Sequence, residues 1–250
     1  LDLMTAVMRR HPRFRFQLQT NGTLLERLPD WVLGRLSNIL VSIDGGEEVT
    51  DGYRGRGIYR RVLKNVNAIR ARAGGTLTAR VTWSSADTSF AELDQLRQDF
   101  DYIYFQFVAQ QGAYTPEATK KKRAVIAQLV REFFRADALY PFIPIMGTVR
   151  NKVLPSLAME LYAGMTQCRA STHILNVMPD GKIYPCPDLM YLPEMLQGDV
   201  VGNWLKRSPL QPHPDMPCER CDAFAYCRRN CMKNLHLAYV RGDADYRKHV

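Results

Sequence analysis

The sequence predicts an α/β fold in which strands and helices alternate, followed by a smaller cysteine-rich domain. Three observations support this prediction. The hydrophobic period of residues 1–112 switches repeatedly between about 2, typical of strands, and about 3.6, typical of helices. The chain has 46% hydrophobic and 24% charged residues, as globular proteins with a substantial core do. All six cysteines lie in the last third of the chain, and residues 1–167 contain none.

Four strands and four helices are predicted to alternate within residues 1–112. The strands are residues 14–18, 39–43, 77–83 and 102–108. The helices are residues 3–8, 24–36, 62–69 and 90–100, the second of them broken at Pro29-Asp30. Connections of this length suit right-handed parallel crossovers. Such strands form either an open doubly wound sheet or part of an α/β barrel, and the pattern alone favours neither.

Residues 113–165 have a different character and are expected to bridge two domains. A long helix is predicted from Pro116 to Ala138, because apolar residues recur there at helical spacing. Prolines at positions 141, 144 and 155 then interrupt the chain before a short helix at 157–163. We therefore expect three parts, residues 1–112, 113–165 and 166–250.

A β-hairpin is predicted near the start of the cysteine-rich domain. Residues 174–178 and 182–184 flank Pro179-Asp180-Gly181, a turn in which glycine supplies the positive φ. Folding this hairpin carries Cys186 back toward Cys168. The turn therefore delivers two thiolates to one site.

Composition restricts the compartment and the partners. No apolar run approaches the roughly 18 residues of a membrane span and there is no signal peptide, so we expect a cytoplasmic protein that binds no membrane. In that compartment the cysteines indicate metal binding rather than disulfides. The formal charge of +9 is compatible with nucleic acid and with any other acidic partner. The run Lys120-Lys121-Lys122-Arg123 is interpreted as a solvated helix face.

The cysteines follow the spacing C-x12-G-x4-C over residues 168–186 and C-x2-C-x5-C-x3-C over residues 218–231. Thiolates select zinc, copper(I) or iron–sulfur clusters over hard cations. The pattern resembles the SPASM domain that follows the catalytic barrel of many radical S-adenosylmethionine (SAM) enzymes. Two further regions resemble consecutive strand ends of that barrel. They are Gln19-Thr20-Asn21-Gly22, and Val41-Ser42-Ile43-Asp44-Gly45 with Asp51-Gly52-Tyr53-Arg54-Gly55.

This resemblance covers nearly the whole chain and implies a partial radical SAM (β/α) barrel followed by a SPASM domain. The nearest likeness is to peptide-modifying radical SAM/SPASM enzymes, which carry two auxiliary 4Fe–4S clusters. By the resemblance, one cluster is ligated by Cys168, Cys186 and Cys231, and the other by Cys218, Cys221 and Cys227. The alternative is a four-thiolate zinc site made by the last four cysteines. Their gaps fit zinc knuckles poorly, and two cysteines would be left over.

The resemblance also implies a SAM site at the strand ends. Ser42 and Arg54 would hold the SAM carboxylate, for which the fork of a guanidinium is chemically suited. The alternative is that Arg54 pairs with Asp51 or Asp44 to fix the loop while Ser42 caps a strand.

Three other residues are weighed for the same site. Thr20 and Asn21 belong to the neighbouring strand end, where they either contact SAM or form a turn. Arg80 lies on a strand between apolar neighbours and is a further candidate. The segment 55–60 is expected to open a helix after a strand, but it lacks the third glycine of G-x-G-x-x-G. No dinucleotide site is therefore expected.

Two departures from the family pattern limit what the chain is expected to do. The C-x3-C-x2-C loop that holds the SAM-cleaving cluster is absent, because no cysteine precedes Cys168. We therefore expect a fragment that does not generate a 5′-deoxyadenosyl radical by itself. The seventh SPASM cysteine is also absent after Cys231. Four residues could replace this cysteine as a cluster ligand, although each is more simply interpreted as a solvated surface residue. They are His236, Asp243, Asp245 and His249.

The implied function is enzymatic. The intact protein would use SAM and a 4Fe–4S cluster to abstract hydrogen from a peptide or protein, while the auxiliary clusters accept electrons or position the substrate. An electron donor such as flavodoxin or ferredoxin is implied, and no residue is assigned as catalytic acid or base. Two alternatives stay open. One is a non-catalytic, zinc-stabilised basic domain that binds nucleic acid, and the other is a degenerate homologue that only binds substrate.

Overall fold

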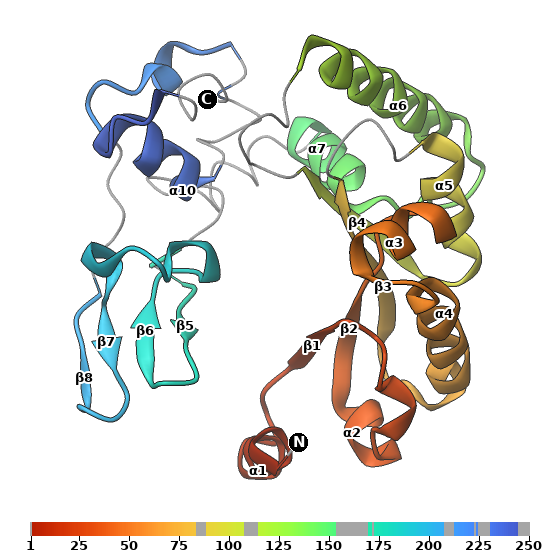
Figure 1. The fold of residues 1–250 in the computed structure, drawn as a ribbon, viewed down its shortest axis with the longest axis horizontal. Coiled ribbons are helices and arrows are strands. Elements are labelled where there is room, and N and C mark those ends of the chain that lie inside the picture. The colour runs from red at the N-terminus through yellow and green to blue at the C-terminus, as the bar shows by residue number, and fades with distance from the viewer. Residues whose placement is uncertain are drawn as a thin grey trace. The chain divides into compact units, whose positions relative to one another are not determined.

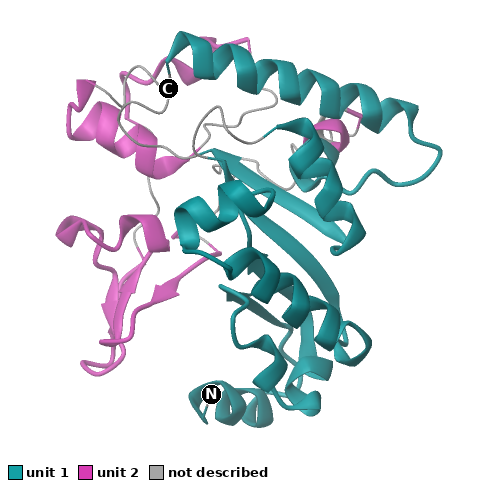
Figure 2. Ribbon diagram, turned by 45° about the vertical axis from the view of Figure 1, so that its right-hand side comes forward, with its two compact units in different colours: residues 1–147 teal, residues 148–250 magenta. Residues whose placement is uncertain are grey.

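The computed structural model of the 250-residue chain describes residues 2–83, 89–107, 115–153, 170–171, 173–207, 213–222, 224 and 231–244. The chain divides into two compact units, residues 1–147 and 148–250 (Figure 2). A separate bridge over residues 113–165 stays a prediction. In the described residues, no helix combines the length and the apolar character that a membrane crossing requires.

A parallel four-stranded sheet forms the centre of the first unit (Figure 1). Its strands are β1 (Phe16–Thr20), β2 (Leu36–Ser42), β3 (Thr76–Trp83) and β4 (Tyr102–Phe107). They are ordered β1-β2-β3-β4, and every neighbouring pair is parallel. The predicted alternation of strands and helices is therefore confirmed, although the first strand begins at Phe16 and leaves Phe14 60% exposed.

Helices connect these strands and continue beyond them. Their bounds are α1 (Asp2–Arg10), η1 (Leu25–Arg27), α2 (Asp30–Arg35), α3 (Glu47–Arg54), α4 (Ile58–Ile69), η2 (Arg70–Arg72), α5 (Phe90–Gln95), η3 (Leu96–Gln98), α6 (Pro116–Arg135) and α7 (Ile143–Val153). The expected break at Pro29 separates η1 from α2. Helix α3 was not predicted, so the prediction that segment 55–60 follows a strand is wrong: it joins α3 to α4.

The two faces of the sheet differ in chemistry. One face is mostly apolar and carries buried residues such as Val41, Ala79 and Ile103, which are 0% exposed. Figure 1 shows α4 and α5 together on one side of the sheet. The alternate residues form the other face, called here the polar face. It carries Gln17, Gln19, Asn38, Leu40, Ser42, Thr76, Thr78, Arg80, Thr82, Tyr102, Tyr104 and Gln106.

The second unit contains a small antiparallel sheet in the order β5-β6-β7-β8. Its strands are β5 (Asn176–Val177), β6 (Lys182–Tyr184), β7 (Gly198–Asp199) and β8 (Trp204–Leu205). The predicted hairpin is confirmed as β5 and β6, and Gly181 in its turn has φ +89°. The second hairpin, β7 and β8, was not predicted. The expected helix at 157–163 lies outside the described residues.

Short helices hold the segments that follow this hairpin. They are η4 (Pro187–Leu189), η5 (Pro193–Met195), η6 (Pro217–Arg220), α10 (Met232–Leu235) and the π-helix η7 (His236–Val240). Leu189 at 0% exposure and Met195 at 8% pack with Tyr184 into the core of this unit. The residues that follow Cys186 are thereby fixed against the hairpin.

Candidate functional site

The carboxyl edge of the parallel sheet brings together the strand ends that the sequence singled out. Thr20 is the last residue of β1 and Ser42 the last of β2. Thr20 is paired in register with Val41, and Ser42 with Arg80 of β3. Ligands of parallel α/β proteins bind at this edge, because the strands deliver their loops there.

Thr20 and Asn21 form the turn after β1. The Thr20 hydroxyl accepts a hydrogen bond from the Gly22 amide at 3.1 Å. The Asn21 side-chain oxygen accepts from the amide and the hydroxyl of Thr23 at 3.1 and 2.9 Å. The turn-forming role is thus the one observed, and contact with a cofactor stays a prediction.

Ser42 and Arg80 lie side by side on the polar face. Ser42 is 9% exposed, while the amide of the next residue, Ile43, donates to the Arg80 carbonyl at 3.2 Å. The Arg80 guanidinium donates from Nη2 to Oε1 of Gln106 on β4 at 3.1 Å. A hydroxyl and a half-buried guanidinium therefore share one end of the sheet.

Arg54 is engaged by Asp44, one of the two partners that the sequence left open. Its Nε and Nη2 donate to the two carboxylate oxygens of Asp44 at 2.5 and 2.8 Å. The Asp44 side chain is 5% exposed and that of Arg54 is 24% exposed. Asp44 also accepts from the Thr82 amide at 3.1 Å, and its own amide donates to the Thr50 hydroxyl at 3.1 Å. The pair ties α3 to the ends of β2 and β3.

Asp51, the other candidate partner of Arg54, has a different role. Its carboxylate accepts from the amides of Tyr59 at 2.9 Å and Gly57 at 2.6 Å. These amides, Tyr59 first, lower the pKa of Asp51. Asp51 therefore caps the start of α4 from the preceding helix, in the manner of an N-cap carboxylate.

Helix α3 places Arg54 at this edge, and its own sequence signals are weak. It has only eight residues and contains Gly52, which disfavours a helix. The available signals are Glu47 and Glu48 in its first turn and Gly55 at its end, where φ is +107°.

Four of the six cysteines lie in the described part of the second unit, and Cys168 and Cys227 lie outside it. Cys186 and Cys231 are half-buried free thiols, and Cys221 is an exposed one. Burial raises the pKa of the Cys186 thiol, the amides of Asp188 and Leu189 lower it, and the Cys231 charge raises it. Cys186 and Cys231 are therefore within electrostatic reach of each other, although they are far apart in sequence.

Cys218 and Cys221 lie on one tight turn. Cys218 is the second residue of η6, and Cys221 is the C-cap residue that directly follows it. The Cys221 amide donates to the Cys218 carbonyl at 3.1 Å. Among the described residues no group of three or more metal-binding side chains is found. Each expected ligand triad has one member outside those residues, so both triads stay predictions.

An ionic link joins the segments that carry Cys186 and Cys231. Glu194 on η5 accepts from Arg241 at 2.9 and 2.7 Å and is 3.2 Å from Nε2 of His236. Its own amide, Arg241 and His236 lower the pKa of Glu194 to about 2. Sequence reasoning missed this link, because nothing local in the sequence relates residue 194 to residues 236 and 241.

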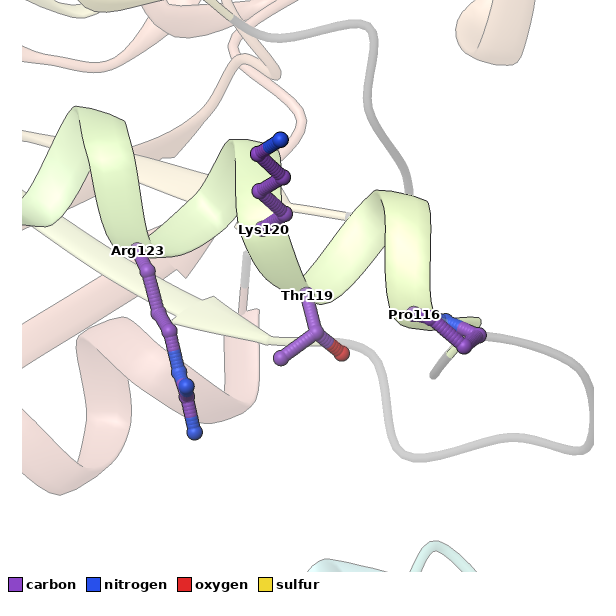
Figure 3. A pocket seen from close by; sticks show the side chains of 4 residues that line it. All are labelled: Pro116, Thr119, Lys120 and Arg123. Carbon is purple, nitrogen blue, oxygen red and sulfur yellow. The ribbon is translucent and has the colours of Figure 1, made fainter.

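The basic run at the start of α6 is only partly the solvated face that was predicted. A hollow of about 470 Å³ lies along these turns, and Pro116, Thr119, Lys120 and Arg123 line it (Figure 3). Lys122 contradicts the prediction, because it is 5% exposed and its Nζ lies 5.2 Å from the centroid of the Phe107 ring. Burial lowers the pKa of Lys122. Position 122 points inward because the helix turns by about 100° per residue.

No protein-family description and no curated protein sequence matches the chain. Solved structures of anSMEcpe, a radical SAM/SPASM anaerobic sulfatase-maturating enzyme, do match its fold. Hexahistidine-tagged anSMEcpe with bound AdoMet is 14% identical, and the match has a TM-score of 0.66 and covers 100% of this chain and 75% of anSMEcpe. Native anSMEcpe with AdoMet and the Kp18Cys peptide is 16% identical, with a TM-score of 0.64 and coverages of 92% and 70%. The complex with the Cp18Cys peptide is 15% identical, with a TM-score of 0.66 and coverages of 100% and 79%. The chain therefore has the fold of radical SAM/SPASM enzymes, and its parallel sheet is part of an α/β barrel rather than an open sheet.

Proposed function

We propose that this chain is part of a radical SAM enzyme that binds SAM at the carboxyl edge of the β1–β4 sheet and modifies a peptide or protein. The observation that carries the proposal is the fold match over the whole chain to anSMEcpe, whose structures contain AdoMet and peptides. The place of Ser42 at the end of β2 supports it, because this edge is where barrel enzymes bind their ligands.

In this proposal the polar face of the sheet holds SAM. The Ser42 hydroxyl would donate a hydrogen bond to the cofactor. The turn formed by Thr20 and Asn21 would border the site. The resemblance assigns the SAM carboxylate to Arg54, which Asp44 holds in place. SAM, when cleaved at a reduced 4Fe–4S cluster, supplies the species that abstracts hydrogen. Residues 1–167 contain no cysteine to hold that cluster.

We further propose that the second unit holds auxiliary 4Fe–4S clusters, with the two ligand triads that the resemblance implies. Its donor set suits iron–sulfur clusters, since thiolates are their usual ligands. The electrostatic reach between Cys186 and Cys231 supports their place in one triad. The amides of Asp188 and Leu189, which interact with the Cys186 sulfur, would lower the charge on a bound thiolate and so tune its potential.

An electron donor and a cellular location also belong to the proposal. The reaction consumes an electron, and we assign its supply to a small redox protein such as a flavodoxin or ferredoxin. Thiolate ligands and reduced clusters suit a reducing compartment, so we place the protein in the cytoplasm.

The proposal is tested by equilibrium dialysis of the purified protein against SAM under anaerobic conditions. We expect binding, and we expect Ser42→Ala to weaken it roughly 5- to 10-fold through the loss of one hydrogen bond. Ser37→Ala is the matched control, because Ser37 lies on the same strand but its hydroxyl donates to the Phe16 carbonyl at 2.9 Å. Failure of the unaltered protein to bind SAM, or equal effects of the two substitutions, would refute the proposed site.

A further inference from the structure

We propose that the hollow at the start of α6 binds an acidic segment of the peptide or protein that the enzyme modifies. This hollow has a volume of about 470 Å³ and is lined by Pro116, Thr119, Lys120 and Arg123 (Figure 3). The acidic character of its occupant follows from the charge of these residues. The identity of that occupant as the substrate rests on the proposed function.

The two cations of the hollow keep their full charge. Lys120 and Arg123 are exposed, and neither forms an ion pair with any residue in the described part of the chain. At the other end of the same helix, Arg135 is paired with Glu132 at 3.5 Å. The positive charge of Lys120 and Arg123 is therefore available to an anion from outside the chain.

The spacing of these cations is unfavourable for the helix by itself. Residues three apart are neighbours on a helix surface, and like charges at that spacing repel each other. Lys121 and Lys122 add two more positive charges to the same turn. Carboxylates bound beside Lys120 and Arg123 would offset this repulsion. Positions that break a local rule of stability in this way are often functional.

The directions of the two side chains favour a partner with more than one carboxylate. In Figure 3, Lys120 and Arg123 extend from the helix in opposite directions, and Thr119 lies on the same side as Arg123. One carboxylate therefore cannot serve both cations equally well. A polypeptide segment that carries several Asp or Glu residues can contact each cation separately, while the Pro116 ring offers it an apolar surface.

The hollow belongs to the same end of the sheet as the proposed SAM site. Phe107 ends β4 at the carboxyl edge, as Ser42 ends β2, because the strands are parallel. Nζ of Lys122 lies 5.2 Å from the centroid of the Phe107 ring, which fixes the start of α6 beside this edge. Only β3 separates β2 from β4, so a few extended residues span the distance between them. A polypeptide bound in the hollow can therefore reach the SAM site with another part of its chain.

The structure favours a polypeptide over two other anionic partners. Helices that bind membranes insert their apolar face into the lipid, but α6 packs that face inside its own unit, where Leu129 is 0% exposed. Nucleic acid binding commonly uses about six or more phosphate contacts, whereas two cations line the hollow. Its volume is within the range of about 300–1,000 Å³ that is usual for small binding sites. A short acidic segment fits these dimensions best.

The test measures the binding of fluorescein-labelled hexaglutamate to the protein by fluorescence anisotropy at low salt, with labelled hexaglutamine as the neutral probe. We expect hexaglutamate alone to bind. The double variant Lys120→Gln/Arg123→Gln should weaken its binding roughly 5- to 10-fold. Arg61→Gln/Lys64→Gln is the matched control, because it removes the same two charges at the same spacing from exposed positions on α4. This control should change the affinity less than about 2-fold.

Equal losses in the two double variants would overturn the inference, because binding would then depend on net charge alone. Tighter binding of hexathymidylate than of hexaglutamate, with the same dependence on Lys120 and Arg123, would also overturn it in favour of nucleic acid. Equilibrium dialysis against SAM separates the inference from the proposed function, and both double variants should keep the SAM affinity of the unaltered protein. If the protein binds SAM but not hexaglutamate, the inference alone fails. If it binds hexaglutamate but not SAM, the proposed function fails, and the assignment of the acidic segment to the substrate fails with it.

Discussion

Asp44 is the residue on which the contacts at the sheet's carboxyl edge converge. Its carboxylate accepts hydrogen bonds from Nε and Nη2 of Arg54 and from the Thr82 amide. Its own amide donates to the Thr50 hydroxyl. Removing this carboxylate, whose side chain is 5% exposed, leaves the Arg54 guanidinium without its ion-pair partner in a largely buried site. Losses of this kind are large, because a partly buried charge is stranded.

We predict that Asp44→Asn lowers the free energy of unfolding by about 3 kcal/mol, as measured by urea denaturation followed by circular dichroism. Glu47→Gln is the control, since Glu47 forms an exposed pair with Arg60 in which the side chains are 43% and 79% exposed. That change should cost less than about 1 kcal/mol. Equal costs for the two variants would contradict the structural role given to Asp44.

At this scale the sequence supplied candidate residues, whose part in binding SAM stays a prediction, but it did not supply their pairings. It named Ser42, Arg54, Thr20 and Asn21 from the resemblance, and it placed Asp44 and Asp51 near Arg54. The choice between the two aspartates depends on helix α3, which turns Arg54 toward Asp44 and leaves Asp51 to cap α4. A helix this short is fixed by its tertiary contacts rather than by propensity.

Among the elements, the turn after β1 is tightly constrained where it meets β2. Gly22 has φ +78°, and a side chain there would meet Cγ1 of Val41 at 2.7 Å. Its carbonyl also accepts from the Asn65 side chain at 2.9 Å. Both the backbone conformation and the close approach of Val41 on β2 therefore require glycine at this position.

We predict that Gly22→Ala destabilises the protein by about 2 kcal/mol, the cost of a left-handed backbone together with the contact at Val41. Gly52→Ala is the matched control, because Gly52 lies within α3 and has nothing within 4 Å of an added Cβ. It should stabilise the helix by up to about 1 kcal/mol. The measurement is thermal unfolding by circular dichroism, and changes of the same sign in both variants would contradict the account.

The ionic link between η5 and the π-helix η7 makes the stability of the second unit depend on pH. The pKa of Glu194 in the folded chain is about 2, below its ordinary value of 4.5. Because the folded-state pKa is lowered, the carboxylate contributes stability that is complete above about pH 4.5 and is lost as the pH falls toward about 2.

We predict that Glu194→Gln lowers the unfolding midpoint near neutral pH and flattens its fall between about pH 5 and pH 3. Thermal melts over this range, with the exposed residue Glu26 changed to Gln as a control, measure the effect. If the unfolding midpoint of Glu194→Gln falls as steeply with decreasing pH as that of the unaltered protein, other carboxylates cause the fall.

Across the whole molecule, hydrophobic periodicity and cysteine spacing predicted the fold, whereas individual side-chain contacts could not be predicted from neighbouring residues. Alternation of apolar residues was enough for four parallel strands, and the turn residues were enough for the β5–β6 hairpin. The same patterns did not distinguish a barrel from an open sheet, since both use identical βα units. That distinction came from the fold match to anSMEcpe, with a TM-score of 0.66 at 14% identity. The Glu194 link and the burial of Lys122 lay beyond sequence reasoning, because both depend on which segments pack together.

The most direct test of the central claim is iron and acid-labile sulfide analysis of the anaerobically reconstituted protein, together with its absorbance near roughly 400 nm. Cys186→Ser and Cys218→Ser serve as paired variants, one from each proposed triad. The account predicts a brown protein in which each variant loses about half of the iron, because each removes a ligand of a different cluster. A colourless protein with stoichiometric zinc, which Cys218→Ser abolishes and Cys186→Ser leaves unchanged, would contradict it.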